Sequence, residues 1–219
     1  AYTDYVKFGS EPVFKNKIDF LMQYNESDWD FLKRLAYLYR ENFFYSGHEL
    51  LFGYYPDLKT VDLTYDKEIL DLEFCSRMTS NNFERYQYVP ETDAIIERES
   101  PEKINESNDY LDKAEEMSHY AMTLQDKSKS YMDTPIYSNS EISEVLKRNK
   151  KRNAAESISV KGRSKTYKTA IGQVINISMP GLLALTSNIG TYRVIKSVHR
   201  VDENGRYSCD FEAVPATID

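Results

Sequence analysis

The chain has 219 residues, of which 41% are hydrophobic, so it can bury a core and form one or two domains. Its formal net charge of -7 argues against a non-specific nucleic-acid binder, because such proteins present a basic face to the phosphates. No apolar run approaches the roughly 20 residues of a membrane-spanning helix, and the first ten residues lack the basic-then-apolar order of a signal peptide.

Residues 1–59 predict a small α+β unit of strand, helix and hairpin. IDFLMQY is strand-like and leads into the helix. Ser27 is a good N-cap residue and Asp30 completes a capping box, so the helix is expected to begin near Asp28. NFFYS and LLFGYY form the hairpin around a turn at Gly47 and His48. The helix carries an apolar stripe expected to face a core: Trp29, Leu32, Leu35, Ala36 and Tyr39.

Residues 60–104 predict consecutive strands. VDLTY and ILDLEF alternate apolar with polar residues, and ERYQYV follows a turn at Asn81 and Asn82.

Residues 105–155 predict a helical hairpin. Pro135 ends the first helix, and Ser140 caps a second one in which Ile142, Val145 and Leu146 face inward. The first helix is expected to pack on its own domain or against the same helix of another subunit. Its stripe has heptad-like spacing: Tyr110, Ala114, Met117, Ala121, Leu124, Ser128 and Tyr131. The second helix carries basic residues expected to stay solvated: Lys147, Arg148, Lys150, Lys151 and Arg152.

Residues 156–219 return to strands. SISVKG, QVINISM, TYRVIKSV and YSCDFEAV are strand candidates, with Asn204 and Gly205 placed for a tight hairpin turn.

Two blocks of the chain carry a family resemblance. QYNESDWDF at residues 23–31, with the sequence that continues to Asp57, resembles VgrG spike proteins of type VI secretion systems and the related baseplate hubs of contractile phage tails. GQVINISMPG, TYRVIKSVHR and YSCDFEAVPA look like the closing barrel strands of the same hubs, in matching order. ERYQYVPETDAIIE is similar to a strand pair that some members carry before a helical insertion.

This resemblance implies an α+β fold with a discontinuous antiparallel β-barrel. Residues 60–104 and 156–219 would form the two parts of the barrel, residues 105–155 a helical insertion, and residues 1–59 a small α+β subdomain. The central expectation is that the two barrel segments share a hydrogen-bonded ladder. A closed barrel also protects strand edges.

The same resemblance implies a structural, non-enzymatic hub subunit that joins an inner tube to a puncturing spike. The implied partners are two further copies in a homotrimer, the tube protein, the spike, baseplate components and effectors, without nucleic acid. Assembly would take place in the bacterial cytoplasm, followed by delivery out of the cell. The alternatives are a phage, prophage or extracellular-particle hub, a hydrolase, and a carbohydrate-binding β module, whose sign would be an exposed aromatic platform.

No catalytic residue, metal ligand or cofactor is predicted. His48, His119 and His199 lack neighbours at metal-ligand spacing, and the glycines form no nucleotide-binding motif. His199 and Cys209 form a possible base and thiol pair, although Cys75 and Cys209 are read as reduced core thiols. Helix starts and solvated faces account for the acidic candidates Asp28, Asp30, Glu97, Glu99, Glu115 and Glu116. The basic run 147–152 is read as a solvated helix face, with an acidic partner or channel as the alternative.

Overall fold

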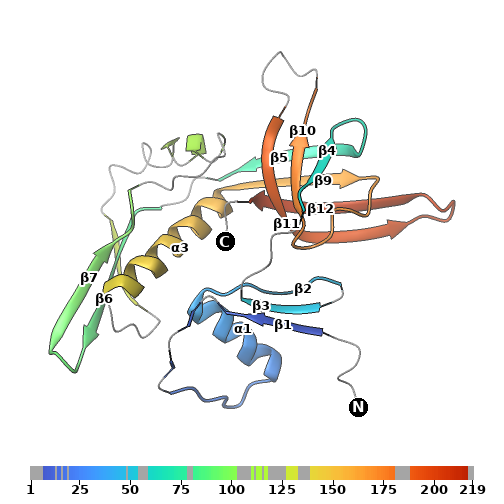
Figure 1. Ribbon diagram of the computed structural model, residues 1–219. Helices are drawn as coiled ribbons and strands as arrows, with labels where there is room; N and C mark the ends of the chain where they lie inside the picture. The colour runs from blue at the N-terminus through green and yellow to red at the C-terminus, as the bar shows by residue number, and fades with distance from the viewer. Residues whose placement is uncertain are drawn as a thin grey trace. The chain divides into compact units, whose positions relative to one another are not determined.

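The computed structural model describes residues 7–12, 14–15, 17–18, 20–47, 49–53, 59–77, 81–102, 110, 112–114, 116–117, 127–132, 139–180 and 188–216. The fold is α+β and mostly strands, as predicted (Figure 1). The chain divides into two compact units. The first contains residues 1–57, and the second contains most of the remainder.

The first unit has a three-stranded sheet and one helix. β3 (Glu49–Gly53) lies in the middle, antiparallel to β2 (Phe43–Tyr45) and parallel to β1 (Lys7–Glu11). The predicted β2–β3 hairpin is confirmed, and its turn uses Gly47 at a φ of 99°, a conformation that glycine adopts without a Cβ penalty. The expected strand IDFLMQY is wrong over Phe20–Tyr24, which lie outside any strand.

Helix α1 (Asp28–Tyr39) begins at the predicted residue. Ser27 caps it, because its Oγ accepts a hydrogen bond from the Asp30 amide at 3.2 Å. The Asp30 carboxylate accepts the Ser27 hydroxyl at 2.6 Å, whereas a capping box would place it on the cap amide. Ala36 is buried, and Trp29 contacts the Phe43 ring with 4.7 Å between centroids.

A six-stranded sheet forms the larger unit's main body, in the order β4-β10-β11-β12-β9-β5. Two edge ladders join sequence-distant segments: β4 (Val61–Thr64) pairs with β10 (Val174–Ser178), and β5 (Ile69–Ser76) pairs with β9 (Ile158–Ser164). The ladder expected between residues 60–104 and 156–219 is therefore present. One pairing departs from a purely antiparallel barrel, because β4 runs parallel to β10.

The sheet must curl, because its two edge strands are consecutive in the chain. Edge strands of a flat six-stranded sheet lie about 24 Å apart, but the five residues from Thr64 to Ile69 reach at most about 18 Å. A bridge between Tyr65 and Ile69 confirms that these edges meet. The result is a curled, barrel-like sheet built from discontinuous segments.

The hairpin of β11 (Asn188–Val201) and β12 (Tyr207–Pro215) is the longest in this sheet. Its connection is a five-residue loop rather than a tight two-residue turn. The Asp202 carboxylate holds it by accepting the amides of Asn204 at 2.9 Å and Arg206 at 2.7 Å. Gly205 adopts a φ of 74° there.

A second three-stranded sheet places β6 (Phe83–Val89) between β7 (Ala94–Glu99) and β8 (Ser128–Tyr131). Two expectations change here. The strand pair 83–99 lies outside the six-stranded sheet, although it was assigned to the barrel. Ser128 and Tyr131 belong to a strand rather than to the heptad helix, because the edge of β6 offers unpaired backbone groups to residues 128–131. The division into domains at residues 59, 104 and 155 stays a prediction.

The second predicted helix is confirmed as α3 (Asn139–Ser157). Most of the first lies outside the described residues, although Ala114 is helical and belongs to the core of the six-stranded sheet. That placement favours packing on its own domain. The main core gathers buried residues from this sheet and the end of α3, among them Leu63, Ile69, Ala154, Val160, Ile175, Ile177, Tyr192 and Phe211. A smaller core lies between α3 and the three-stranded sheet, with Phe83, Met132, Ile142, Val145 and Leu146.

Candidate interaction surfaces

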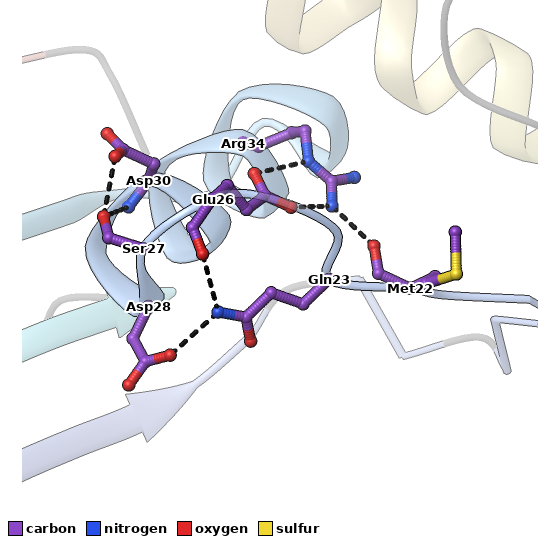
Figure 2. A network of polar contacts seen from close by, with 7 residues as sticks. All are labelled: Met22, Gln23, Glu26, Ser27, Asp28, Asp30 and Arg34. Atoms are coloured by element: carbon purple, nitrogen blue, oxygen red, sulfur yellow. Dashed lines mark hydrogen bonds and ion pairs between the residues drawn. The ribbon is translucent and has the colours of Figure 1, made fainter.

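A polar network fixes the chain at the start of α1 (Figure 2). The Arg34 guanidinium donates two hydrogen bonds to the Glu26 carboxylate, at 3.1 and 2.5 Å, and a third to the Met22 carbonyl at 2.9 Å. Gln23 donates to the Glu26 carbonyl at 3.2 Å and to Asp28 Oδ1 at 2.8 Å. The motif QYNESDWDF thus uses its polar residues to hold its own backbone.

The hydrogen bonds and charges in this network lower the pKa values of two carboxyl groups. The hydrogen bond from Arg34 lowers the pKa of Glu26 below its ordinary value, and the guanidinium charge adds to the effect. The pKa of Asp30 is also lowered, by its hydrogen bonds from Lys33 and Ser27. Both carboxylates are therefore used to hold the helix start, which agrees with the structural role expected for Asp30.

The segment held by this network exposes large apolar side chains. Phe20 is 78% exposed and Tyr24 77% exposed, and Met22 between them is also exposed. Arg34 fixes the backbone at Met22 while these side chains face solvent. An ordered, exposed apolar segment of this kind is typical of a contact surface.

The outer face of the three-stranded sheet is rich in tyrosine. Alternation along β6 turns Tyr86 and Tyr88 away from the face that packs on α3. The strand register places Tyr131 beside Tyr86 and Ile95 beside Tyr88. Tyr131 is 53% exposed and Ile95 63% exposed, and the Tyr86 and Tyr131 rings meet edge to face at 5.7 Å.

A charged row borders these tyrosines. The Lys129 ammonium bridges the carboxylates of Glu97 at 2.8 Å and Glu84 at 3.3 Å, and it lies 5.6 Å from the centre of the Tyr86 ring. Lys127 pairs with Glu99. Glu97 and Glu99 therefore lie in surface ion pairs, in agreement with the solvated face predicted for them.

His199 and Cys209 lie opposite each other on β11 and β12. The Ser197 hydroxyl bridges the two side chains, because its Oγ lies 2.9 Å from His199 Nε2 and 3.2 Å from Cys209 Sγ. His199 Nδ1 bonds the Tyr207 hydroxyl. Cys209 is fully buried, so its thiol is closed to a substrate, and no base–thiol contact between His199 and Cys209 forms. Ser197 was not among the predicted site residues, and no sequence motif marks its position between His199 and Cys209.

The two cysteines are both free. Cys209 is a packed core thiol as predicted, whereas Cys75 is only partly buried. His48, His119 and Glu115 lie outside the described residues, while Glu116 is exposed. Within the described ranges, no group of three or more histidine, cysteine, aspartate or glutamate side chains is arranged to hold a metal ion.

One residue of the basic run 147–152 is buried, contrary to the prediction for the run. Lys150 is 1% exposed, although the whole run was expected to be solvated. A signal for this existed, because Lys150 lies four residues after Leu146 and four before Ala154, on the buried stripe of α3. Lys147 and Arg152 are exposed as expected.

None of the helices in the described part of the chain has the length and apolarity to cross a membrane. Neither a protein-family profile nor a curated protein sequence matches the chain.

Solved structures of tail and particle proteins are similar to this chain. A tail protein from Neisseria meningitidis MC58 aligns with 97% of the chain at a TM-score of 0.61 and 11% identity, over 62% of its own length. The 43 kDa tail protein of prophage MuSo2 from Shewanella oneidensis aligns with 98% at a TM-score of 0.60 and 10% identity, over 63% of its length.

A protein in the virion of a native gene transfer agent particle aligns with 89% of the chain at a TM-score of 0.56 and 13% identity, over 40% of its length. The chain therefore spans less than two thirds of each of these three proteins. None of the three is described as an enzyme. At these identities the likeness concerns architecture, and this chain has the fold of these tail proteins.

Proposed function

We propose that this chain is part of a structural hub protein in a phage or prophage tail, or in a related contractile particle. The observation that carries the proposal is the curled six-stranded sheet with its discontinuous edge ladders, in a fold shared with tail proteins over 97% of the chain. Its role would be mechanical and non-enzymatic, joining the inner tube to the spike. A buried Cys209 thiol agrees with that role and argues against the hydrolase alternative.

A narrower form of this proposal is a VgrG-like subunit of a type VI secretion system. The sequence blocks at residues 23–57 and 172–216 support it, whereas the structural neighbours are described as tail and virion proteins. The genes beside the coding sequence distinguish the two. Capsid and portal genes would identify a phage, and type VI sheath and membrane-complex genes would identify a secretion system.

In either machine the proposed partners are the same in kind. They are two further copies of the full protein, a tube protein, the spike, baseplate components and, in a secretion system, effectors. Assembly would occur in the bacterial cytoplasm and release would follow with the particle. Two exposed surfaces are available for these contacts, the Phe20–Tyr24 segment and the tyrosine face of the three-stranded sheet.

The experiment is to produce the protein extended in both directions along its reading frame and to measure its mass in solution by light scattering. A trimer is expected. A monomer at the micromolar concentrations where such interfaces form would contradict the hub proposal. Immunogold labelling of particles from the producing strain provides the second readout, with label expected at the tube–spike junction.

A second candidate function is binding of a neutral glycan. A carbohydrate-binding module needs an exposed aromatic surface, and Tyr88 and Tyr131 provide one. The aliphatic Ile95 lies beside Tyr88, and carboxylates lie in the neighbouring row. Co-sedimentation with chitin and cellulose, which are neutral glycans, tests it. Tyr131→Ala is expected to abolish binding and Tyr167→Ala, an exposed tyrosine elsewhere, to leave it unchanged. Absence of binding by the unsubstituted protein rejects this candidate.

A further inference from the structure

Lys150 is a lysine buried in the middle of α3 with its ammonium fully supplied with acceptors. Its Nζ donates to the carbonyls of Pro101 and of Glu102, the latter at 2.8 Å, and to Asn82 Oδ1 at 3.4 Å. Three acceptors match the three N–H bonds of an ammonium group. Burying this charge without such partners is strongly unfavourable, so the site is built to hold it.

The acceptors come from both ends of one hairpin. Asn82 directly precedes β6, and Pro101 and Glu102 follow β7. The contact is reciprocal, since the Asn81 side-chain amide donates to the Lys150 carbonyl at 3.3 Å. The hairpin closes at this point through the Ser100 amide, which donates to the Phe83 carbonyl at 2.8 Å. Lys150 therefore forms hydrogen bonds with the residues at both ends of the β6–β7 hairpin.

Helix α3 connects the Lys150 hydrogen bonds to the six-stranded sheet. Its first half packs in the small core through Ile142, Val145 and Leu146. Its last turn contributes Ala154 to the main core and continues into β9 without an intervening loop. Figure 1 shows α3 running between the β6–β7 hairpin and the strand that it enters. The helix is thus the element shared by both cores.

We propose that Lys150 is a positioning residue that locks the three-stranded sheet to α3, and through α3 to the six-stranded sheet, as one rigid body. The small core joins the three-stranded sheet to α3 through apolar contacts, which are not directional. Directional hydrogen bonds to both ends of the hairpin fix its angle. The tyrosine face on the far side of that sheet is then presented at a constant orientation. This inference does not depend on the proposed hub function.

The test replaces the ammonium in the complete 219-residue chain with an uncharged side chain of similar length, as Lys150→Met. The control is Lys147→Met, an exposed lysine on the same helix. Hydrogen exchange at the Phe83 and Ser100 amides is expected to accelerate about tenfold or more in Lys150→Met, as for the loss of a charge-assisted hydrogen bond. Exchange in β12 and in the control variant is expected to stay unchanged.

Orientation is measured separately by pulsed electron paramagnetic resonance between spin labels at Glu91 and Glu203, both exposed hairpin-tip residues, in a Cys75→Ser background. Lys150→Met is expected to broaden the distance distribution, and Lys147→Met is not. A distribution of unchanged width together with unchanged exchange at Phe83 and Ser100 would overturn the proposal.

If Lys150→Met does not fold, the unsubstituted protein still decides the question. Reductive methylation should modify Lys150 more slowly than Lys147 by a factor similar to the protection of the Phe83 and Ser100 amides, because one opening exposes all three. Rapid methylation of Lys150 while these amides stay protected would contradict the lock.

Discussion

Glu26 and Arg34 form the ion pair that holds the chain immediately before α1. The pair is bidentate, and Arg34 also bonds the Met22 carbonyl, so a single guanidinium ties two residues of the preceding segment, Met22 and Glu26, to the helix. Glu26 is partly buried by its neighbours, with its side chain 19% exposed. The consequence is a dependence of local stability on pH.

The stability of the first unit is predicted to fall in acid. A carboxyl group with a lowered folded-state pKa stabilises the fold fully above its unfolded-state pKa, about 4.3 for glutamate, and loses that contribution as pH falls through the lower folded value. Urea unfolding followed by the fluorescence of Trp29, the single tryptophan, measures this between pH 7 and pH 3.

Glu26→Gln separates this pair from other groups. The variant keeps the size of the side chain but lacks the titrating group, so the acid-induced loss should shrink to the part that Asp30 contributes. Asp30→Asn should retain the Glu26 part. A pH profile of Glu26→Gln identical to that of the unsubstituted protein would remove Glu26 from the explanation.

Gly162 on β9 is predicted to tolerate no side chain. A Cβ built there would lie 2.7 Å from Phe211 Cζ and 2.9 Å from the Asp71 carbonyl oxygen. Gly162→Ala should therefore lower the free energy of unfolding of the larger unit by about 1–3 kcal/mol through overpacking. Lys161→Ala, at an exposed neighbouring position, should change it by less than about 0.5 kcal/mol. Urea unfolding followed by circular dichroism compares the two variants.

At the scale of elements, α3 was predictable and the segment before it was not. The inward positions Ile142, Val145 and Leu146 followed from helical spacing and are buried. The helix predicted from the heptad spacing is wrong over Ser128–Tyr131, which form a strand. The segment is short and polar, and it pairs with the open edge of β6. Local spacing contains no information about such a distant edge.

Leu146 tests the contribution of the small core. Leu146 is 1% exposed. Leu146→Ala is expected to lower the free energy of unfolding by about 2–5 kcal/mol, because it removes buried apolar contacts and leaves a cavity. Hydrogen exchange should accelerate in β6 and β8 along with α3. Ser143→Ala on the exposed side of the helix serves as the control. A cost below about 1 kcal/mol would show that α3 and the sheet are held mainly by polar contacts.

At the scale of the whole molecule, the two compact units are expected to unfold separately, because both described core clusters consist of residues of the second unit. Leu51 is buried in the first unit and Ile177 in the second. Leu51→Ala should shift the Trp29 fluorescence transition, while Ile177→Ala should shift the circular dichroism of the strands and leave that transition in place. Equal shifts of both signals in either variant would show that the units unfold as one.

Features that depend on near neighbours could be predicted from the amino-acid sequence: the start of α1 at Asp28, the β2–β3 turn at Gly47, the inward stripe of α3 and the alternation of most strands. Three features depend on the folded chain and could not be predicted: residues 83–99 lie outside the six-stranded sheet, Phe20–Tyr24 lie outside any strand, and Lys150 is buried. The physical reason is that capping, turns and periodicity act over a few residues. Strand pairing and the burial of a charge depend on donors and acceptors supplied by residues far along the chain, about 50 to 70 positions away for Lys150.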